Sequence, residues 1–114
     1  MSKSPITSHI LDTSTGKPAV NVAVELYKLV DNEWLFLTKA NTDDDGRITD
    51  WLAPDTLIDF ATYKLVFDLD SYYSNTTTAA FYPEAQITFR LQDTKHHHIP
   101  LLLSPFGFST YRGS

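Results

Sequence analysis

The chain has 114 residues, of which 42% are hydrophobic and 13% aromatic, and its formal net charge is -5 at pH 7. This length suits a single domain, residues 1–114, and the apolar content is too high for a disordered chain. The acidic balance and the scattered basic residues argue against nucleic acid as a partner, because phosphate binding needs clustered Lys and Arg.

The chain contains no cysteine. This excludes disulfides, thiolate zinc sites and a cysteine nucleophile, and it favours a reducing compartment. The opening Met-Ser-Lys-Ser-Pro lacks the apolar stretch of a signal peptide, and no run reaches the roughly 20 apolar residues of a membrane span. We therefore expect a cytoplasmic protein without a membrane partner, or a periplasmic one if a leader has been removed.

Short runs of β-forming residues separated by turn formers recur along the chain, a pattern typical of a sandwich or barrel. Strands are expected, in chain order, at 6–12, 20–27, 33–40, 47–51, 63–69, 85–92, 96–103 and 106–112, with one short helix at 70–75. The second run alternates from Val20 to Leu26, which indicates one buried face, and Asp31-Asn32 predicts a tight hairpin turn. Without long helical runs, the sequence predicts an all-β antiparallel sandwich of two sheets.

Histidine is the natural acid or base near neutral pH, and the chain has His9 and a run of three at 96–98. In a strand, His96 and His98 share one face and His97 points the opposite way. Such a His-x-His pair, with His9 as a third ligand, would also suit zinc. From the residues alone, a polar strand end, acid/base chemistry and metal binding all stay open.

The segment 41–47 superficially resembles the start of an EF-hand loop. The calcium interpretation fails because Leu52 stands where a bidentate Glu is required and no helix flanks the segment. We instead expect a turn in which Asp side chains accept backbone N–H bonds and Gly46 takes a positive φ. Such a turn would hold Arg47 at the start of the next strand, where a guanidinium can bind a carbonyl or an oxyanion. Taken alone, Arg47 is better explained as a surface residue.

The chain ends in Tyr111-Arg112-Gly113-Ser114. Chain ends commonly fray, but here the strand pattern runs almost to the last residue. In a strand over 106–112, Arg112 and Ser114 share a face, and Tyr111 lies on the opposite one unless the strand twists or breaks near Gly113.

Three segments together resemble the 5-hydroxyisourate hydrolases, the transthyretin-like enzymes of purine catabolism and urate degradation. They are Ser-His-Ile-Leu-Asp at 8–12 with Thr-Gly-Lys-Pro-Ala at 15–19, Thr-Asp-Asp-Asp-Gly-Arg at 42–47, and 96–114 with its Tyr-Arg-Gly-Ser end. The Tyr-Arg-Gly-Ser end is the hallmark of the enzymes, and transthyretin lacks it. The resemblance implies a transthyretin-like sandwich of two four-stranded sheets with one short helix. It also implies a homotetramer with active sites at the dimer–dimer interface.

The resemblance further implies the reaction, which is hydrolysis of 5-hydroxyisourate to 2-oxo-4-hydroxy-4-carboxy-5-ureidoimidazoline without a metal or other cofactor. The implied catalytic residues are His9, Arg47, His98 and Ser114. The substrate-binding set contains the same four residues together with Tyr111 and Arg112. Whether His9 or His98 is the general base stays open. This chain departs from the family at His97, where an aromatic residue commonly stands.

Two alternatives use the same residues differently. A transthyretin-like carrier of a small ligand should have apolar or neutral side chains in place of His9, Arg47 and His98, and no Tyr-Arg-Gly-Ser end. A His-based metal-binding sandwich would use the histidines but would give Arg47 and the tail no role. The hydrolase is the favoured interpretation, and it depends on the resemblance rather than on the fold class.

Overall fold

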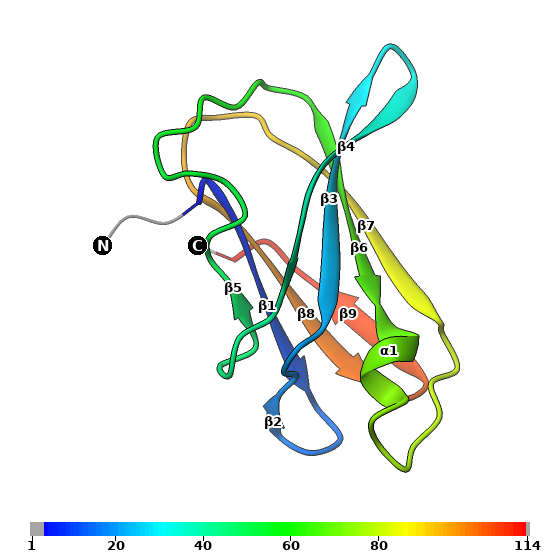
Figure 1. Ribbon diagram of the computed structural model, residues 1–114. Helices are drawn as coiled ribbons and strands as arrows, with labels where there is room; N and C mark the ends of the chain where they lie inside the picture. Colours follow the sequence, from blue (N-terminus) through cyan, green and yellow to red (C-terminus); the bar gives the residue numbers. More distant parts are fainter. Residues whose placement is uncertain (1–3, 114) are drawn as a thin grey trace.

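Two β-sheets packed against each other form the computed structural model, which describes residues 4–113 (Figure 1). The sheet that we call the β1–β8 sheet contains β1 (Ile6–Asp12), β2 (Lys17–Pro18), β5 (Arg47–Ile48), β8 (His97–Ser104) and β9 (Gly107–Thr110). The second, the β3–β6 sheet, contains β3 (Ala23–Val30), β4 (Glu33–Asn41), β6 (Thr62–Asp68) and β7 (Glu84–Arg90). Helix α1 (Leu69–Tyr73) follows β6 directly.

The predicted all-β, two-sheet architecture is confirmed, with two differences in detail. Within residues 4–113 the β1–β8 sheet has five strands instead of four, in the order β2-β1-β8-β9 with β5 also on β1. In addition, β1 and β8 run parallel, whereas an antiparallel sandwich was expected. The β3–β6 sheet has the order β4-β3-β6-β7 and is antiparallel throughout. The parallel pair brings the first described strand beside one of the last (blue and orange in Figure 1).

The core lies between the two sheets and follows the alternation of the strands. Val24 and Leu26 of β3 are fully buried from one sheet, as is Val22 just before it, and Ile10, Leu101 and Leu103 of the other sheet belong to the same cluster. Burying a side chain of this size contributes about 1.5–3 kcal/mol. Val20 was expected on the buried face but is 41% exposed. The reason is that β3 begins only at Ala23, after Asn21 turns the chain with a φ of 61°.

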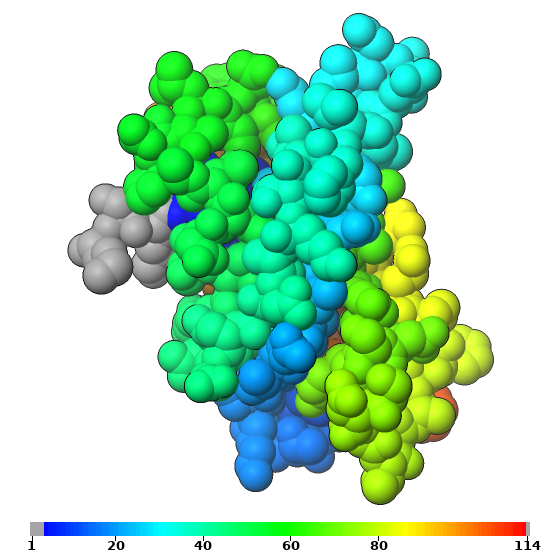
Figure 2. All heavy atoms as spheres, viewed as in Figure 1, coloured from blue at the N-terminus to red at the C-terminus, as the bar shows by residue number. Residues whose placement is uncertain are grey.

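The ends of several elements depend on local backbone geometry. Asp31 and Asn32 have φ values of 50° and 65°, which confirms the predicted tight turn between β3 and β4. The resulting hairpin projects from the body of the molecule (cyan in Figure 2). Helix α1 begins one residue earlier than expected and ends at Tyr73, and its N-cap Asp68 accepts a hydrogen bond from Ser71 N at 3.1 Å. Among residues 4–113, no helix has the length and apolarity needed to cross a bilayer.

Candidate active site

The outward face of the β1–β8 sheet collects polar side chains from three strands. On β1 and β8 the inward positions belong to the core, so the alternate positions, among them His9 and His98, face outward. The parallel register sets Thr7 beside His98, and the antiparallel pairing of β5 sets Arg47 beside His9. Three of the sequence-predicted site residues therefore lie on neighbouring strands of one face.

The rings of His9 and His98 lie close together on this face. Their centroids are 6.5 Å apart and the ring planes meet at 28°. Both side chains are half-buried, whereas Arg47 is exposed. Two imidazoles and a guanidinium so arranged can move a proton and bind an oxygen that carries negative charge.

A tight turn over 43–47 places Arg47 at this position. The Asp43 carboxylate accepts hydrogen bonds from the backbone N–H groups of Asp45 and Arg47, both at 2.9 Å. Gly46 has a φ of 73°, and a Cβ there would lie 2.6 Å from the carbonyl oxygen of Ile10. The carbonyl oxygen of Gly46 also accepts a hydrogen bond from Ile10 N at 2.8 Å, and this bond attaches the turn to β1. The predicted Asp-capped turn with a positive φ at Gly46 is confirmed.

The surroundings of His9 favour its neutral form. Burial lowers the pKa of His9 below its ordinary value of 6.5, and the positive charge of Arg47 lowers it further. A backbone hydrogen bond involving Asp45 and the carboxylates of Asp43 and Asp45 act in the opposite direction, but the net shift is downward. A neutral imidazole can accept a proton, so these effects keep His9 available as a base near neutral pH.

His98 is hydrogen-bonded on its inner side to Thr7, a residue that the sequence analysis did not select. Thr7 Oγ1 lies 2.7 Å from His98 Nδ1 and 2.8 Å from His96 Nε2, and Thr7 is 1% exposed. The His96 and His98 ring centroids are 6.3 Å apart. No sequence signal marked Thr7, because its place beside His98 depends on the parallel pairing of two strands 91 residues apart.

His97 points into the sandwich, as strand parity predicted. It is 3% exposed, its Nδ1 donates to the carbonyl oxygen of Lys95 at 2.8 Å, and its buried Nε2 has no hydrogen-bond partner. The family-atypical histidine is therefore separated by the sheet from His96 and His98. Among residues 4–113 there is no group of three or more His, Cys, Asp or Glu side chains placed to hold a metal ion.

The tail returns to β8 beside His98. Strand β9 ends at Thr110, earlier than the predicted 106–112, and Gly113 then forms an isolated bridge with His98, with Gly113 N 2.8 Å from His98 O. A Cβ at Gly113 would lie 2.6 Å from His98 Cδ2, so glycine is needed for this close approach. The break in the strand that the sequence analysis considered near Gly113 thus falls at positions 111 and 112.

Tyr111 and Arg112, the other predicted tail residues that the structure describes, are exposed. Tyr111 is 58% exposed, and Arg112 Nη2 lies 3.6 Å from Asp93 Oδ2 in an exposed ion pair. A shallow hollow beside them is lined by Asp93, Lys95, His96, Arg112 and Gly113. Ser114 lies outside the described residues.

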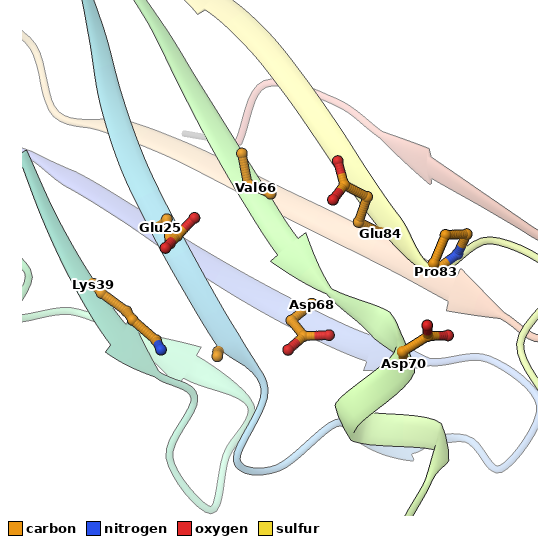
Figure 3. Close-up of a pocket in the computed structure, with 8 residues that line it drawn as sticks. Glu25, Lys39, Val66, Asp68, Asp70, Pro83 and Glu84 are labelled. Atoms are coloured by element: carbon orange, nitrogen blue, oxygen red, sulfur yellow. The ribbon is translucent and has the colours of Figure 1, made fainter. Parts of the chain in front are cut away.

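A second hollow, on the outer face of the β3–β6 sheet, has different chemistry (Figure 3). Its lining contains one cation, Lys39, and four carboxylates: Glu25, Asp68, Asp70 and Glu84. None of its lining residues is a histidine, and its charge would repel an anionic ligand. We therefore assign the candidate active site to the β1–β8 face.

Comparison with known proteins agrees with this fold. The model of the HIUase/Transthyretin family matches residues 6–113. A probable 5-hydroxyisourate hydrolase from Caenorhabditis elegans is 40% identical over 110 residues, which cover 96% of this chain and 80% of the relative. The structure of Klebsiella pneumoniae 5-hydroxyisourate hydrolase matches with a TM-score of 0.82 at 34% identity, covering 96% of this chain and 98% of that one. The structure of sea bream transthyretin in complex with thyroxine matches with a TM-score of 0.90 at 27% identity, and the match covers 96% of this chain and 95% of that one.

Proposed function

Because the chain belongs to the HIUase/Transthyretin family, we propose that it is a 5-hydroxyisourate hydrolase of urate and purine catabolism, with residues 1–114 as one hydrolase domain. Relatives of that name match nearly the whole chain at about 40% identity, as the C. elegans protein does with 40% identity over 96% of this chain. The Klebsiella enzyme has the same fold.

The polar face built by His9, Arg47 and His98 is the observation that carries the proposal. The fold alone does not separate an enzyme from a carrier, since sea bream transthyretin shares it with a TM-score of 0.90. A carrier of a small aromatic ligand would bind it with apolar or neutral side chains. Here the neighbouring outward positions hold two imidazoles 6.5 Å apart and a guanidinium instead.

The proposed reaction adds one water molecule across a ring amide. Water attacks a carbonyl carbon of 5-hydroxyisourate, the C–N bond to the adjacent ring nitrogen breaks, and the six-membered ring opens. The water oxygen ends in the new carboxylate of 2-oxo-4-hydroxy-4-carboxy-5-ureidoimidazoline, and a proton ends on the departing nitrogen. The substrate hydrolyses slowly unaided, so positioning and proton transfer are sufficient tasks for the protein, and no metal enters the scheme.

Each residue has a role in this scheme. One imidazole, His9 or His98, takes a proton from water, while the other orients the water or protonates the leaving nitrogen. Arg47 binds substrate oxygens and stabilises the negative charge that develops on the attacked carbonyl. Ser114 holds a ligand or a histidine through its hydroxyl or terminal carboxylate. Tyr111 and Arg112 contribute to substrate binding at the rim.

The active site is completed in a homotetramer, at the interface between two dimers. The open position of the site on one chain supports this part of the proposal, since Arg47 is exposed and His9 only half-buried. A reaction of this kind is favoured when the site is shielded from bulk water, and a second copy over this face would provide the shield. Sedimentation velocity at decreasing protein concentration, run in parallel with activity, tests it: we expect activity per chain to fall as the assembly dissociates.

The cytoplasm is the proposed compartment, since a chain without cysteine suits a reducing environment. Fractionation of cells that express the protein from its own gene, with a periplasmic marker enzyme as control, tests this assignment.

The deciding experiment couples uricase to the purified protein and follows the decay of 5-hydroxyisourate by absorbance. We expect decay well above the spontaneous rate, and an unchanged rate would overturn the hydrolase. Two further measurements on the same protein test the carrier and the metal-enzyme alternatives. Binding of thyroxine without turnover would favour a carrier, and activity lost on chelation and restored by zinc would favour a metal enzyme.

A further inference from the structure

The Thr7 hydroxyl, which the proposed mechanism does not use, lies buried between two imidazoles. Its oxygen is 2.7 Å from His98 Nδ1 and 2.8 Å from His96 Nε2, both within the range of a good hydrogen bond. Thr7 is 1% exposed, so water cannot readily replace either contact. The hydroxyl and the two rings therefore form one hydrogen-bonded unit on the inner side of His98.

A hydroxyl has a single hydrogen, and this constrains both rings. Thr7 can donate to at most one of the two nitrogens, so at least one of them carries a hydrogen and donates to Thr7. If Thr7 donates to His96 Nε2, then His98 Nδ1 must carry a hydrogen and donate to Thr7. In the reverse arrangement His98 Nδ1 is the acceptor and its Nε2 carries the hydrogen. Whenever Thr7 donates to one ring, the nitrogen of the other ring that contacts Thr7 must carry a hydrogen, so the tautomers of His98 and His96 are then tied.

We propose that Thr7 is a positioning residue that holds His98 as its Nδ1–H tautomer, with hydrogen bonds running from His98 Nδ1 to Thr7 Oγ1 and from Thr7 Oγ1 to His96 Nε2. This proposal rests on the proposed hydrolase function, because the direction of the two hydrogen bonds is chosen so that His98 can act as a base. In this arrangement Nε2 of His98 is the acceptor nitrogen. In the reverse arrangement Nε2 is already protonated and cannot take a proton from water.

His98 can then take up a proton without any change in its hydrogen bond to Thr7. An O–H bond of water breaks as an N–H bond forms at His98 Nε2, and the bond from His98 Nδ1 to Thr7 stays in place. The positive charge so formed can be shared with His96 if one proton moves from His98 Nδ1 to Thr7 Oγ1 and another from Thr7 Oγ1 to His96 Nε2. No other bond is made or broken, and no co-reactant is needed.

The fold makes Thr7 suited to this role. The parallel register pairs Thr7 directly with His98, and its β-branched side chain has few rotamers, so the hydroxyl is held at low entropic cost. The next hydroxyl along β1 is not equivalent, because Ser8 is on the buried side of the strand and donates to the carbonyl oxygen of Ile99 at 2.7 Å. Ser8 therefore offers a matched control on the same strand.

The test compares wild type, Thr7→Val, Thr7→Ser and Ser8→Ala in the uricase-coupled assay. Valine keeps the shape of threonine without its hydroxyl, whereas serine keeps the hydroxyl. We expect Thr7→Val to lower kcat by about 100-fold, the scale of a general-base contribution, with KM little changed. Thr7→Ser should recover most of this loss. Ser8→Ala should lose stability but retain kcat, which separates positioning from packing.

A second readout reports on the tautomer directly. Long-range ¹H–¹⁵N spectra of protein labelled with ¹⁵N-histidine distinguish Nδ1–H from Nε2–H rings. We expect Nδ1–H at His98 in wild type and Thr7→Ser, and a shift toward Nε2–H in Thr7→Val. If Thr7→Val fails to fold, His96→Gln breaks the same unit at its outer end and should move the His98 signals and lower kcat.

The two proposals fail in different ways. A wild-type protein that does not accelerate 5-hydroxyisourate decay overturns the hydrolase, while the spectra still report whether Thr7 couples the two rings. An Nε2–H tautomer at His98 in wild type overturns the Thr7 proposal. The Thr7 proposal is also overturned if the Thr7→Val protein has unchanged kcat and unchanged His98 signals. The same result for His96→Gln overturns it if Thr7→Val does not fold.

Discussion

The two outward faces of the sandwich carry different chemistry. On the β1–β8 face, His96 and His98 both contact the buried hydroxyl of Thr7. Arg47 lies opposite His9 in the pairing of β5 with β1. The β3–β6 face carries the carboxylate-lined hollow, and its Lys64 Nζ lies 4.4 Å from the centroid of the Trp34 ring. The first face carries the imidazoles that proton transfer near neutral pH would need, whereas the second has carboxylates and cation–π contacts typical of a solvated surface.

The difference arises from how the two sheets are assembled. The β3–β6 sheet is made of antiparallel neighbours, with β3 and β4 in one hairpin and β3 and β6 paired between positions 35 to 43 residues apart. The β1–β8 sheet joins strands 91 residues apart and adds the 43–47 turn, so it can bring together side chains that no local element could. The contrast between the candidate active face and the solvated face can be tested by substitutions confined to the candidate active face.

The largest expected effect is that of His98→Asn. Asparagine keeps a polar group beside Thr7 but cannot take up a proton near neutral pH, so we expect kcat to fall by about 10²–10⁴-fold. The free energy of unfolding should change by only about 0.5 kcal/mol, since the side chain is half-buried at the surface of the sheet. Lys39→Gln on the opposite face is the control and should leave kcat unchanged. Equal activity of His98→Asn and wild type would remove His98 from the mechanism.

The next effect concerns the contact between the tail and His98. Gly113→Ala would place a Cβ 2.6 Å from His98 Cδ2, so either the ring or the tail must move. Because small displacements of a catalytic group are costly, we expect kcat to fall by about 10–100-fold. Gly107→Ala is matched, since its Cβ would meet nothing closer than Ser104 Oγ at 3.8 Å, and it should retain activity. A Gly113→Ala enzyme as active as Gly107→Ala would show that the tail does not position His98.

A smaller effect is expected in the turn that places Arg47. Gly46 and Gly16 have nearly equal φ values of 73° and 71°, so alanine at either site is strained by about 1–2 kcal/mol. Only at Gly46 does the new Cβ also collide with backbone, 2.6 Å from the carbonyl oxygen of Ile10. Urea unfolding should therefore show Gly46→Ala to be the less stable of the two. Only this variant should raise KM, because it displaces Arg47; equal stability and KM would contradict the assigned role of the turn.

The smallest effect is on the titration of His9. Since burial and Arg47 lower the pKa of His9 below 6.5, the unfolded chain takes up a proton at higher pH than the folded one. This contribution to stability is therefore present above pH 6.5 and is lost as the pH falls from 6.5 through the lower folded pKa. NMR titration of Arg47→Ala should give a higher His9 pKa than wild type, because the positive charge that lowers the pKa is removed while burial and the nearby Asp43 and Asp45 remain. An unchanged pKa would mean that Arg47 does not act on His9.

Much of this molecule follows from local patterns. A run of β-forming residues predicted the strand from Ile6 to Asp12, and strand parity predicted the opposite directions of His97 and His98. The EF-hand comparison, once rejected, left an Asp-capped turn that the structure contains. These features depend on the two-residue period of a strand and on the φ of one glycine, and both are readable within a few residues.

The parts that only tertiary structure decided all involve β1 and β8. The sequence did not indicate that these strands pair in parallel, that Thr7 lies between two imidazoles, or that Gly113 passes against the His98 ring. A strand's alternation determines which side chains share a face, but the partner strand and its register are selected by packing the two sheets into one core. Because that selection joins positions 91 residues apart, no local stretch of sequence contains it, and the candidate active site forms only when the sheet is assembled.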